Sequence, residues 1–474
     1  MAITGQETKP TLKTAMPGPK SKAIVARDDV ALATTTKTAP VTAVRGKGVV
    51  VEDADGNVLL DFAAGIGVLN VGHSHPHVVQ AIQDQAARLV HFAGTDFYYD
   101  QQVTLAERLG KLVPIAGATK VFYTNSGTES NEAAIKLAKH ATGRQMFLAF
   151  LGAFHGRTQG SLALTTSKPR HREGFFPTMP GVVHAAFPNP YRNPWRIDGY
   201  GQPDELAERA IESIKVLLEA ACPAKDTAAV FWEPVQGEGG YVVPPKPFPR
   251  MLRELCDEHG ILLVADEVQT GFGRTGKWFA SEHFGVKADI VSIAKAMASG
   301  VPMGAAVLRA DLDFKEKGKH SNTYGGNVLA CAAALATLDV LQKEKLVENS
   351  AKLGAHLARR LDELKDGTPA IGDRRGLGLM QAVEFVKPGT QGAGGAPAPD
   401  PALRDAVEEG CWQRGLVLLG CGTSSLRVIP SLNVTKAQID GAMDVLAEAV
   451  AAATRNGHAK PGKPKARSAL VAKG

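Results

Sequence analysis

Short apolar runs, rich in β-branched and aromatic residues, alternate with longer amphipathic stretches through the middle of the chain. Five of these runs are predicted to be strands: VFYTN (121–125), MFLAF (146–150), AAVFWEP (228–234), ILLVADEV (261–268) and ADIVSIAK (288–295). The runs are almost continuously apolar, so both faces of the strands should be covered. The pattern therefore predicts an α/β fold with a mostly parallel sheet between helices.

The pattern changes after Asn327. Two helical stretches, 328–346 and 348–364, precede short strands near 377–385 and 425–432. Near the start of the chain, residues 48–62 resemble a hairpin turning at DADG. We predict a large domain of residues 90–325 and a smaller α+β domain built from 41–89 and 326–455.

The two ends of the chain lack any hydrophobic period. Residues 1–40 are rich in Lys, Thr, Ala and Pro, and residues 456–474 are rich in Lys, Gly and Ala. Both are predicted to be poorly ordered tails, although the first could partly dock.

Composition narrows the class of protein. Residues 457–474 carry five basic residues and no acid, so removing them from the net charge of +6 leaves +1, which argues against a nucleic-acid partner. Five scattered cysteines without a CxxC spacing argue against a disulfide framework or zinc site and favour a cytoplasmic setting. No apolar run approaches the roughly 18 to 20 residues of a membrane span, so we expect a soluble protein with no membrane partner.

Ligands of open parallel sheets bind beyond the carboxyl ends of the strands. Asp266 ends the run ILLVAD, and a buried carboxylate there needs a cationic partner such as the protonated ring nitrogen of pyridoxal phosphate. Gln269, three residues later, could reach the phenolic oxygen of the same ring. Taken alone, Asp266 could equally cap a loop.

Lys295 ends the run DIVSIAK. An amine desolvated at the end of a buried strand can be uncharged near neutral pH and form an imine with an aldehyde. Taken alone, Lys295 could instead be a surface lysine with a buried stem.

Two further strand ends carry suitable residues. Ser126, Gly127 and Thr128 precede an amphipathic helix whose N-terminus could bind a phosphate, although a plain N-cap is an alternative. Phe154 and His155 lie just beyond MFLAF, where Phe154 could stack on a heteroaromatic ring or belong to the core. The chain thus offers, in order, a phosphate-binding helix end, an aromatic ring for stacking, an acid and an amine. Together these four features predict a pyridoxal phosphate site.

Two other motifs are set aside. GFGRTG (271–276) fits a dinucleotide fingerprint, but no amphipathic helix follows at once. HSHPH (73–77) offers three histidines interrupted by proline, so no metal site is expected.

The sequence resembles the class III (ω-amino-acid) aminotransferases of fold type I, which include 4-aminobutyrate, ornithine and acetylornithine aminotransferases. The match covers residues 40 to 453 and rests on eight motifs in order: DFAAGIGVLNVGHSHP (61–76), TNSGTESNEAAIKLA (124–138), FHGRT (154–158), EPVQGEGG (233–240), ADEVQTGFGRTG (265–276), SIAK (292–295), SNTYGGN (321–327) and GCGTSSLRVIP (420–430). The resemblance implies pyridoxal 5′-phosphate as cofactor and a large, mostly parallel or mixed sheet domain with a smaller α+β domain.

The resemblance also implies roles for nine cofactor-binding residues. They are Ser126, Gly127 and Thr128 on the phosphate, Phe154 on the ring with His155 beside it, Asp266 on the ring nitrogen, Gln269 on the phenolic oxygen, Lys295 as imine lysine and proton carrier, and Thr323 on the phosphate of the neighbouring subunit. The last role implies a homodimer, or a higher homo-oligomer, with active sites at the interface.

For the substrate, the resemblance implies that Arg427 clamps an α-carboxylate and that Glu233 is its switchable partner. Arg157 matches the position that holds a distal carboxylate, although a surface arginine is the alternative. The expected reaction moves an amino group from an ω-amino acid, of the ornithine, 4-aminobutyrate, lysine or acetylornithine type, to 2-oxoglutarate.

A narrower resemblance keeps a second reaction open. NPYRNPWRIDGY (189–200), GGYVVPPKPF (239–248), HSNTYGGN (320–327) and LLGCGTSSLRVIP (418–430) resemble a subgroup that includes amino-acid racemases. The alternative function is therefore a pyridoxal-phosphate-dependent racemase.

Overall fold

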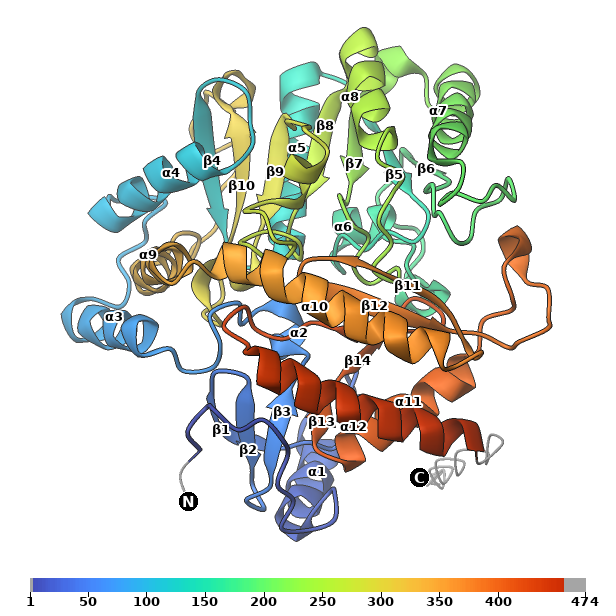
Figure 1. Ribbon diagram of the computed structural model, residues 1–474. Helices are drawn as coiled ribbons and strands as arrows, with labels where there is room; N and C mark the ends of the chain where they lie inside the picture. The colour runs from blue at the N-terminus through green and yellow to red at the C-terminus, as the bar shows by residue number, and fades with distance from the viewer. Residues whose placement is uncertain (1–2, 456–474) are drawn as a thin grey trace, which may run out of the picture.

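The structure of the protein is a computed structural model that describes residues 3–455. Its centre is a seven-stranded sheet in the order β4 (Thr119–Thr124), β10 (Gly304–Arg309), β9 (Ile290–Ile293), β8 (Leu262–Asp266), β7 (Thr227–Trp232), β5 (Met146–Phe150) and β6 (Val182–Ala185) (Figure 1). β10 runs antiparallel to both of its neighbours, and the other printed pairings of this sheet are parallel. The prediction of a mixed, mostly parallel sheet is confirmed.

All five runs predicted as strands are strands of this sheet, and β6 and β10 are additional. β6 is short and partly exposed, whereas β10, GAAVLR, begins with small residues of weak β propensity. β10 forms a strand because it fills the position between β4 and β9, which is a tertiary effect.

Side chains alternate between the two faces of the sheet, and each face has its own core. Phe147, Phe231 and Val264 pack with the apolar side of α5 (Gly127–Thr142). Leu148 and Trp232 belong to the larger core that continues onto the helices of the opposite face. These helices are α4 (Asp100–Leu112), α7 (Pro203–Ala220), α8 (Phe248–His259) and α9 (Val328–Lys343). Helices thus cover both faces, as the apolar runs predicted.

Two smaller sheets lie below the central one in Figure 1. One contains β1 (Ala43–Lys47), β2 (Val50–Asp53), β3 (Val58–Asp61) and β13 (Leu416–Val417), and the other contains β11 (Ile371–Leu377), β12 (Met380–Phe385), β15 (Ser425–Val428) and β14 (Leu419–Cys421). β2 and β3 form the predicted hairpin. The remaining α-helices are α1 (Pro19–Ala31), α2 (Ala64–Gly67), α3 (Pro76–Arg88), α6 (Gln159–Leu164), α10 (Leu346–Asp366), α11 (Pro401–Gln413) and α12 (Lys436–Arg455).

The division into domains stays a prediction. Among the described residues, every strand of the seven-stranded sheet falls within 90–325, and every strand of the smaller sheets falls within 41–89 or 326–455.

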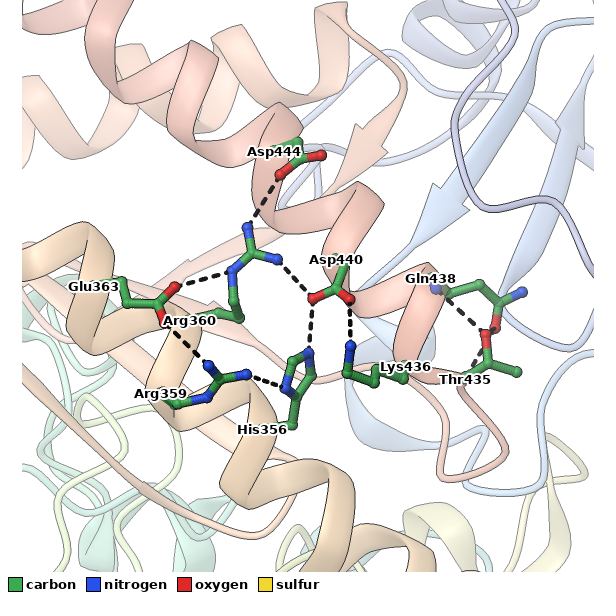
Figure 2. A network of polar contacts seen from close by, with 9 residues as sticks. All are labelled: His356, Arg359, Arg360, Glu363, Thr435, Lys436, Gln438, Asp440 and Asp444. Atoms are coloured by element: carbon green, nitrogen blue, oxygen red, sulfur yellow. Dashed lines mark hydrogen bonds and ion pairs between the residues drawn. The ribbon is translucent and has the colours of Figure 1, made fainter.

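Charged side chains join α10 to α12 (Figure 2). Arg360 donates to Asp440 at 2.6 Å and to Asp444 at 3.0 Å, and a ring nitrogen of His356 lies 2.7 Å from Asp440. Burial opposes the charge of Asp440, but its bonds to His356 and Arg360 outweigh burial and lower its pKa to about 2. The network fixes the position of α12 on the smaller part of the molecule.

The N-terminal segment differs from its prediction. Within residues 3–40, Thr11 pairs with Val58 of β3, and the backbone N–H of Ser21 donates to Asp55 in the hairpin turn. Gln438 of α12 donates to the carbonyl oxygen of Gly5. The prediction of a poorly ordered tail is wrong for these residues because the smaller sheet supplies partners that composition cannot reveal. The predicted C-terminal tail, 456–474, lies outside the described residues.

A helix long and apolar enough to cross a membrane does not occur between residues 3 and 455.

Candidate active site

A cavity of about 440 Å³ lies at the carboxyl ends of the central strands. Ten of the twelve predicted site residues line it: Ser126, Gly127, Thr128, Phe154, His155, Arg157, Glu233, Asp266, Gln269 and Lys295. Its volume is within the range of about 300–1,000 Å³ typical of small-molecule sites. Arg427 and Thr323 are not among the lining residues.

Asp266, the last residue of β8, is held by three donors. Its Oδ2 accepts from Asn131 Nδ2 at 2.7 Å and from His155 Nδ1 at 2.8 Å, and its Oδ1 accepts from the backbone N–H of Val268 at 3.0 Å. Burial disfavours a charged His155, but the bond and charge of Asp266 and the charge of Glu233 outweigh it and raise the pKa of His155. The contacts with Asn131, His155 and Val268 fix the position of the Asp266 carboxyl group at the end of β8.

Lys295 follows β9 and begins a short 3₁₀ turn, Lys295–Ala298. Its backbone adopts φ +41°, in the left-handed region that is uncommon for residues other than glycine. Burial lowers the pKa of Lys295, although the charges of Asp266 and Glu233 oppose this. The constrained backbone and the lowered pKa suit an amine that reacts while uncharged.

The N-terminus of α5 forms another part of the wall. Ser126 caps the helix by accepting from the backbone N–H of Glu129 at 3.4 Å. A Cβ at Gly127 would lie 2.7 Å from Val268 Cγ1, so only glycine fits without displacing that side chain. The free N–H groups and dipole of this helix end suit a phosphate.

Phe154 and Val268 supply apolar surface to the same cavity. The edge of His171 packs on Phe154 with ring centroids 5.6 Å apart, and Tyr241 donates to Gln269 at 2.8 Å, so both predicted ring contacts are held in place. An acid, an amine, a helix N-terminus and apolar walls in one cavity fit a phosphorylated aromatic aldehyde.

The prediction that Glu233 pairs with Arg427 is wrong. Glu233 accepts from the backbone N–H groups of Phe154 and Gly237, both at 3.0 Å, and burial raises its pKa to about 7 although the His155 charge opposes this. Arg427 instead lies 3.2 Å from Glu238, Nη1 to Oε2. The motif EPVQGEGG contains both glutamates, and its chain reversal, marked by the pairing of Gln236 with Val242, decides which one faces β15.

Glu238 also pairs with a second cation, Lys168, at 2.6 Å. The side chain of Arg427 is 7% exposed, and its Nε and Nη1 atoms have no hydrogen-bond partner. Asn131, Lys168, Glu238 and Tyr241 are thus site residues that the sequence reasoning missed. Asn131 lies inside the motif TNSGTESNEAAIKLA and Glu238 inside EPVQGEGG, whereas no motif or hydrophobic period marks Lys168.

Arg157 is exposed at the cavity, with its guanidinium carbon 5.7 Å from the centroid of Phe154. Thr323 is also exposed, and its predicted contact with a neighbouring subunit stays a prediction.

Two histidines of the histidine-rich segment contact carboxylates. His73 lies 2.8 Å from Asp61 and His75 lies 2.9 Å from Glu344. Within residues 3–455, no group of three or more His, Cys, Asp or Glu is arranged to hold a metal ion.

Comparison with known proteins identifies close relatives. The family model described as aminotransferase class-III matches residues 31–450. An alanine/serine racemase of Pyrococcus horikoshii is 37% identical, covering 92% of this chain and 91% of that protein. An acetylornithine aminotransferase of Methanosarcina mazei is 42% identical, covering 86% and 92%. The solved structure of an (S)-enantioselective ω-transaminase from Thermomicrobium roseum is 33% identical with a TM-score of 0.81, covering 92% and 98%.

Proposed function

Because the chain belongs to the class III aminotransferases, whose cofactor is pyridoxal 5′-phosphate, we propose that it transfers an amino group from an ω-amino acid to 2-oxoglutarate. The donor would be of the ornithine, 4-aminobutyrate, lysine or acetylornithine type. The observation that carries the proposal is one cavity lined by Lys295, Asp266 and Arg157, in which the lining residue Glu238 pairs with a second arginine, Arg427.

The cofactor would be held by residues from five segments of the chain. Ser126, Gly127 and Thr128 would bind its phosphate, and Phe154 would stack on its ring with His155 beside it. Asp266 would pair with the ring nitrogen and Gln269 with the phenolic oxygen. Thr323 would reach the phosphate site of a neighbouring subunit. Lys295 would form the covalent link.

When bound, the cofactor supplies an electron sink for the negative charge that develops on the substrate carbon bearing the amine. Lys295 Nζ, whose pKa burial lowers, would remove the proton from that carbon and, for amino-group transfer, deliver it to the carbon of the cofactor that carries the imine. Asp266, held by Asn131 and His155, would keep the ring nitrogen protonated.

The substrate carboxylates would be bound by Arg427 and Arg157. Arg427 would hold the α-carboxylate of 2-oxoglutarate through nitrogens that lack hydrogen-bond partners, and Arg157 would hold the distal carboxylate. For a donor without a carboxylate beside the reacting amine, Glu238 would remain on Arg427.

A racemase is the second candidate, favoured by the racemase relative and by the four sequence segments quoted for that subgroup. In that reaction the proton would return to the same carbon from the opposite face.

The protein would act as a homodimer or higher homo-oligomer in the cytoplasm, with small-molecule substrates. Exposed large apolar side chains, five of them within residues 89–98, support self-association: Leu89, Val90, Phe92, Phe97, Tyr98 and Tyr324. All five cysteines are free and buried, which fits a reducing compartment.

The test is glutamate formation from ω-amino acids and 2-oxoglutarate, beside a mixture without the oxo acid analysed by chiral chromatography. Transamination predicts glutamate in the full mixture and little D-amino acid in the other. If D-amino acid accumulates faster than glutamate forms, the chain is a racemase.

A further inference from the structure

Glu238 lies between two cations that come from different parts of the chain. Its Oε1 accepts from Lys168 Nζ at 2.6 Å, and its Oε2 lies 3.2 Å from Arg427 Nη1. The side chains of Glu238 and Lys168 are 19% and 18% exposed. Burial opposes the charge on Glu238, but Arg427 and Lys168 outweigh it and lower its pKa, so the carboxylate stays ionised.

The backbone on both sides of this contact is fixed. The carbonyl oxygen of Glu238 accepts from the backbone N–H of Gly422 at 2.7 Å, and a Cβ at Gly239 would lie 2.3 Å from the carbonyl oxygen of Gly152. Near Lys168, Thr166 donates to Phe150 and accepts from the N–H of Gly152, both at 3.0 Å. Glu238 can therefore leave Arg427 only by rotation of its side chain.

An arriving α-carboxylate needs the guanidinium of Arg427, so it displaces Glu238. The Glu238 carboxylate is mostly shielded from solvent, so its release without a partner is unfavourable. Lys168 removes this difficulty because it already contacts the other oxygen of the same carboxylate.

We propose that Lys168 is a positioning residue that retains the Glu238 carboxylate when a substrate carboxylate occupies Arg427, and so sets the affinity for substrates with a carboxylate beside the reacting carbon. This inference deepens the proposed function and rests on it for the assignment of Arg427. Donors whose reacting amine has no adjacent carboxylate leave the Arg427–Glu238 pair intact and do not need Lys168.

The test compares Lys168→Met, Lys168→Arg and Arg170→Met in the holoenzyme. Arg170 is exposed two residues away and has no ion pair with Glu238, so it controls for the loss of one local charge. Binding of glutarate, an unreactive dicarboxylate, is measured by calorimetry and needs no turnover. KM values are measured for 2-oxoglutarate and, separately, for the amino donor.

We expect Lys168→Met to weaken glutarate binding and raise the KM for 2-oxoglutarate by about 10- to 100-fold, the equivalent of one charge-assisted hydrogen bond. The donor KM should change by less than about threefold. Lys168→Arg and Arg170→Met should stay close to wild type, and the melting temperature should hardly move because a partly exposed ion pair contributes little.

Equal loss for donor and acceptor, or unchanged glutarate binding in Lys168→Met, would overturn the inference. Failure of the proposed function gives a different result, since the wild type would then form no glutamate. In that case L-alanine, an α-carboxylate substrate in the racemase alternative, replaces 2-oxoglutarate: Lys168→Met should raise the KM for L-alanine by the same factor, and Arg170→Met should leave it unchanged.

Discussion

Replacing Asp266 by Asn keeps the size of the side chain and removes its charge. Oδ1 accepts from the backbone N–H of Val268, which cannot reverse, so the amide oxygen should stay there. The amide NH₂ then faces the Nδ2 of Asn131 and the Nδ1 of His155, which are both donors to Asp266. His155 can respond only by losing its charge and accepting at Nδ1.

The lost contact to the ring nitrogen sets the smallest effect that we expect, and the loss of the ring's proton adds to it. A charge-assisted hydrogen bond to the ring nitrogen is worth about 1.5–3 kcal/mol, or roughly 10- to 150-fold at about 1.4 kcal/mol per tenfold. The ring then loses its proton and its capacity as an electron sink, so we expect kcat/KM to fall by several orders of magnitude and cofactor affinity to fall with it.

The rate of the half-reaction is measured from the absorbance changes of the bound cofactor in a single turnover, and the affinity for the cofactor is measured by dialysis. A cofactor analogue methylated at the ring nitrogen carries a permanent positive charge, so it should recover part of the activity of Asp266→Asn and none of that of Lys295→Ala. Activity within about tenfold of wild type in Asp266→Asn would refute the assignment of Asp266 to the ring nitrogen.

Three further outcomes are expected. Lys295→Ala should abolish turnover and leave the cofactor only non-covalently bound, and borohydride should label Lys295 in wild type; a peptide map with the label elsewhere contradicts this. Arg157→Ala should raise the KM for 2-oxoglutarate more than that for the amino donor in steady-state assays, and equal changes would speak against its role. Asp440→Asn should lower the free energy of unfolding at pH 7 by about 1 kcal/mol or less, because the pairs with His356 and Arg360 are partly exposed. Since the pKa of Asp440 is lowered from 3.8 to about 2 in the folded protein, this stabilisation is present above about pH 4 and is lost as the pH falls towards 2. Urea titrations measure the difference in free energy of unfolding between wild type and Asp440→Asn, and a difference that is no smaller at pH 3 than at pH 7 would contradict this expectation.

The sequence predicted the cofactor side of the cavity better than the substrate side. Asp266 and Lys295 end neighbouring strands of one sheet, and parallel strands bring their carboxyl ends to one edge, so chain order alone indicated that they would meet. The pairing of Arg427 depends on a chain reversal between two glutamates five residues apart, and spacing cannot show which one turns towards β15. Lys168 reaches Glu238 across 70 residues from an irregular segment, where no periodicity exists to be recognised.

The structure of the N-terminal segment, residues 3–40, also depends on contacts with residues far away in the sequence. The apolar hairpin at 48–62 was recognisable, but the docking of residues 3–40 depends on two distant contacts. The N–H of Ser21 donates to Asp55 in the hairpin turn, and the carbonyl oxygen of Gly5 accepts from Gln438 of α12.

The small sheet β1-β2-β3-β13 has a consequence for how the protein is made. One edge of β3 pairs with β13, Leu60 opposite Leu416, so about 350 residues separate two adjacent strands. Every strand of the seven-stranded sheet is complete once residue 309 has left the ribosome. Thr11 can already pair with Val58 on this edge of β3, but the part of the edge at Leu60 and Asp61 stays open until residue 417 has followed. Open strand edges recruit other chains. We therefore expect nascent or truncated chains that end between these points to aggregate through the open part of this edge.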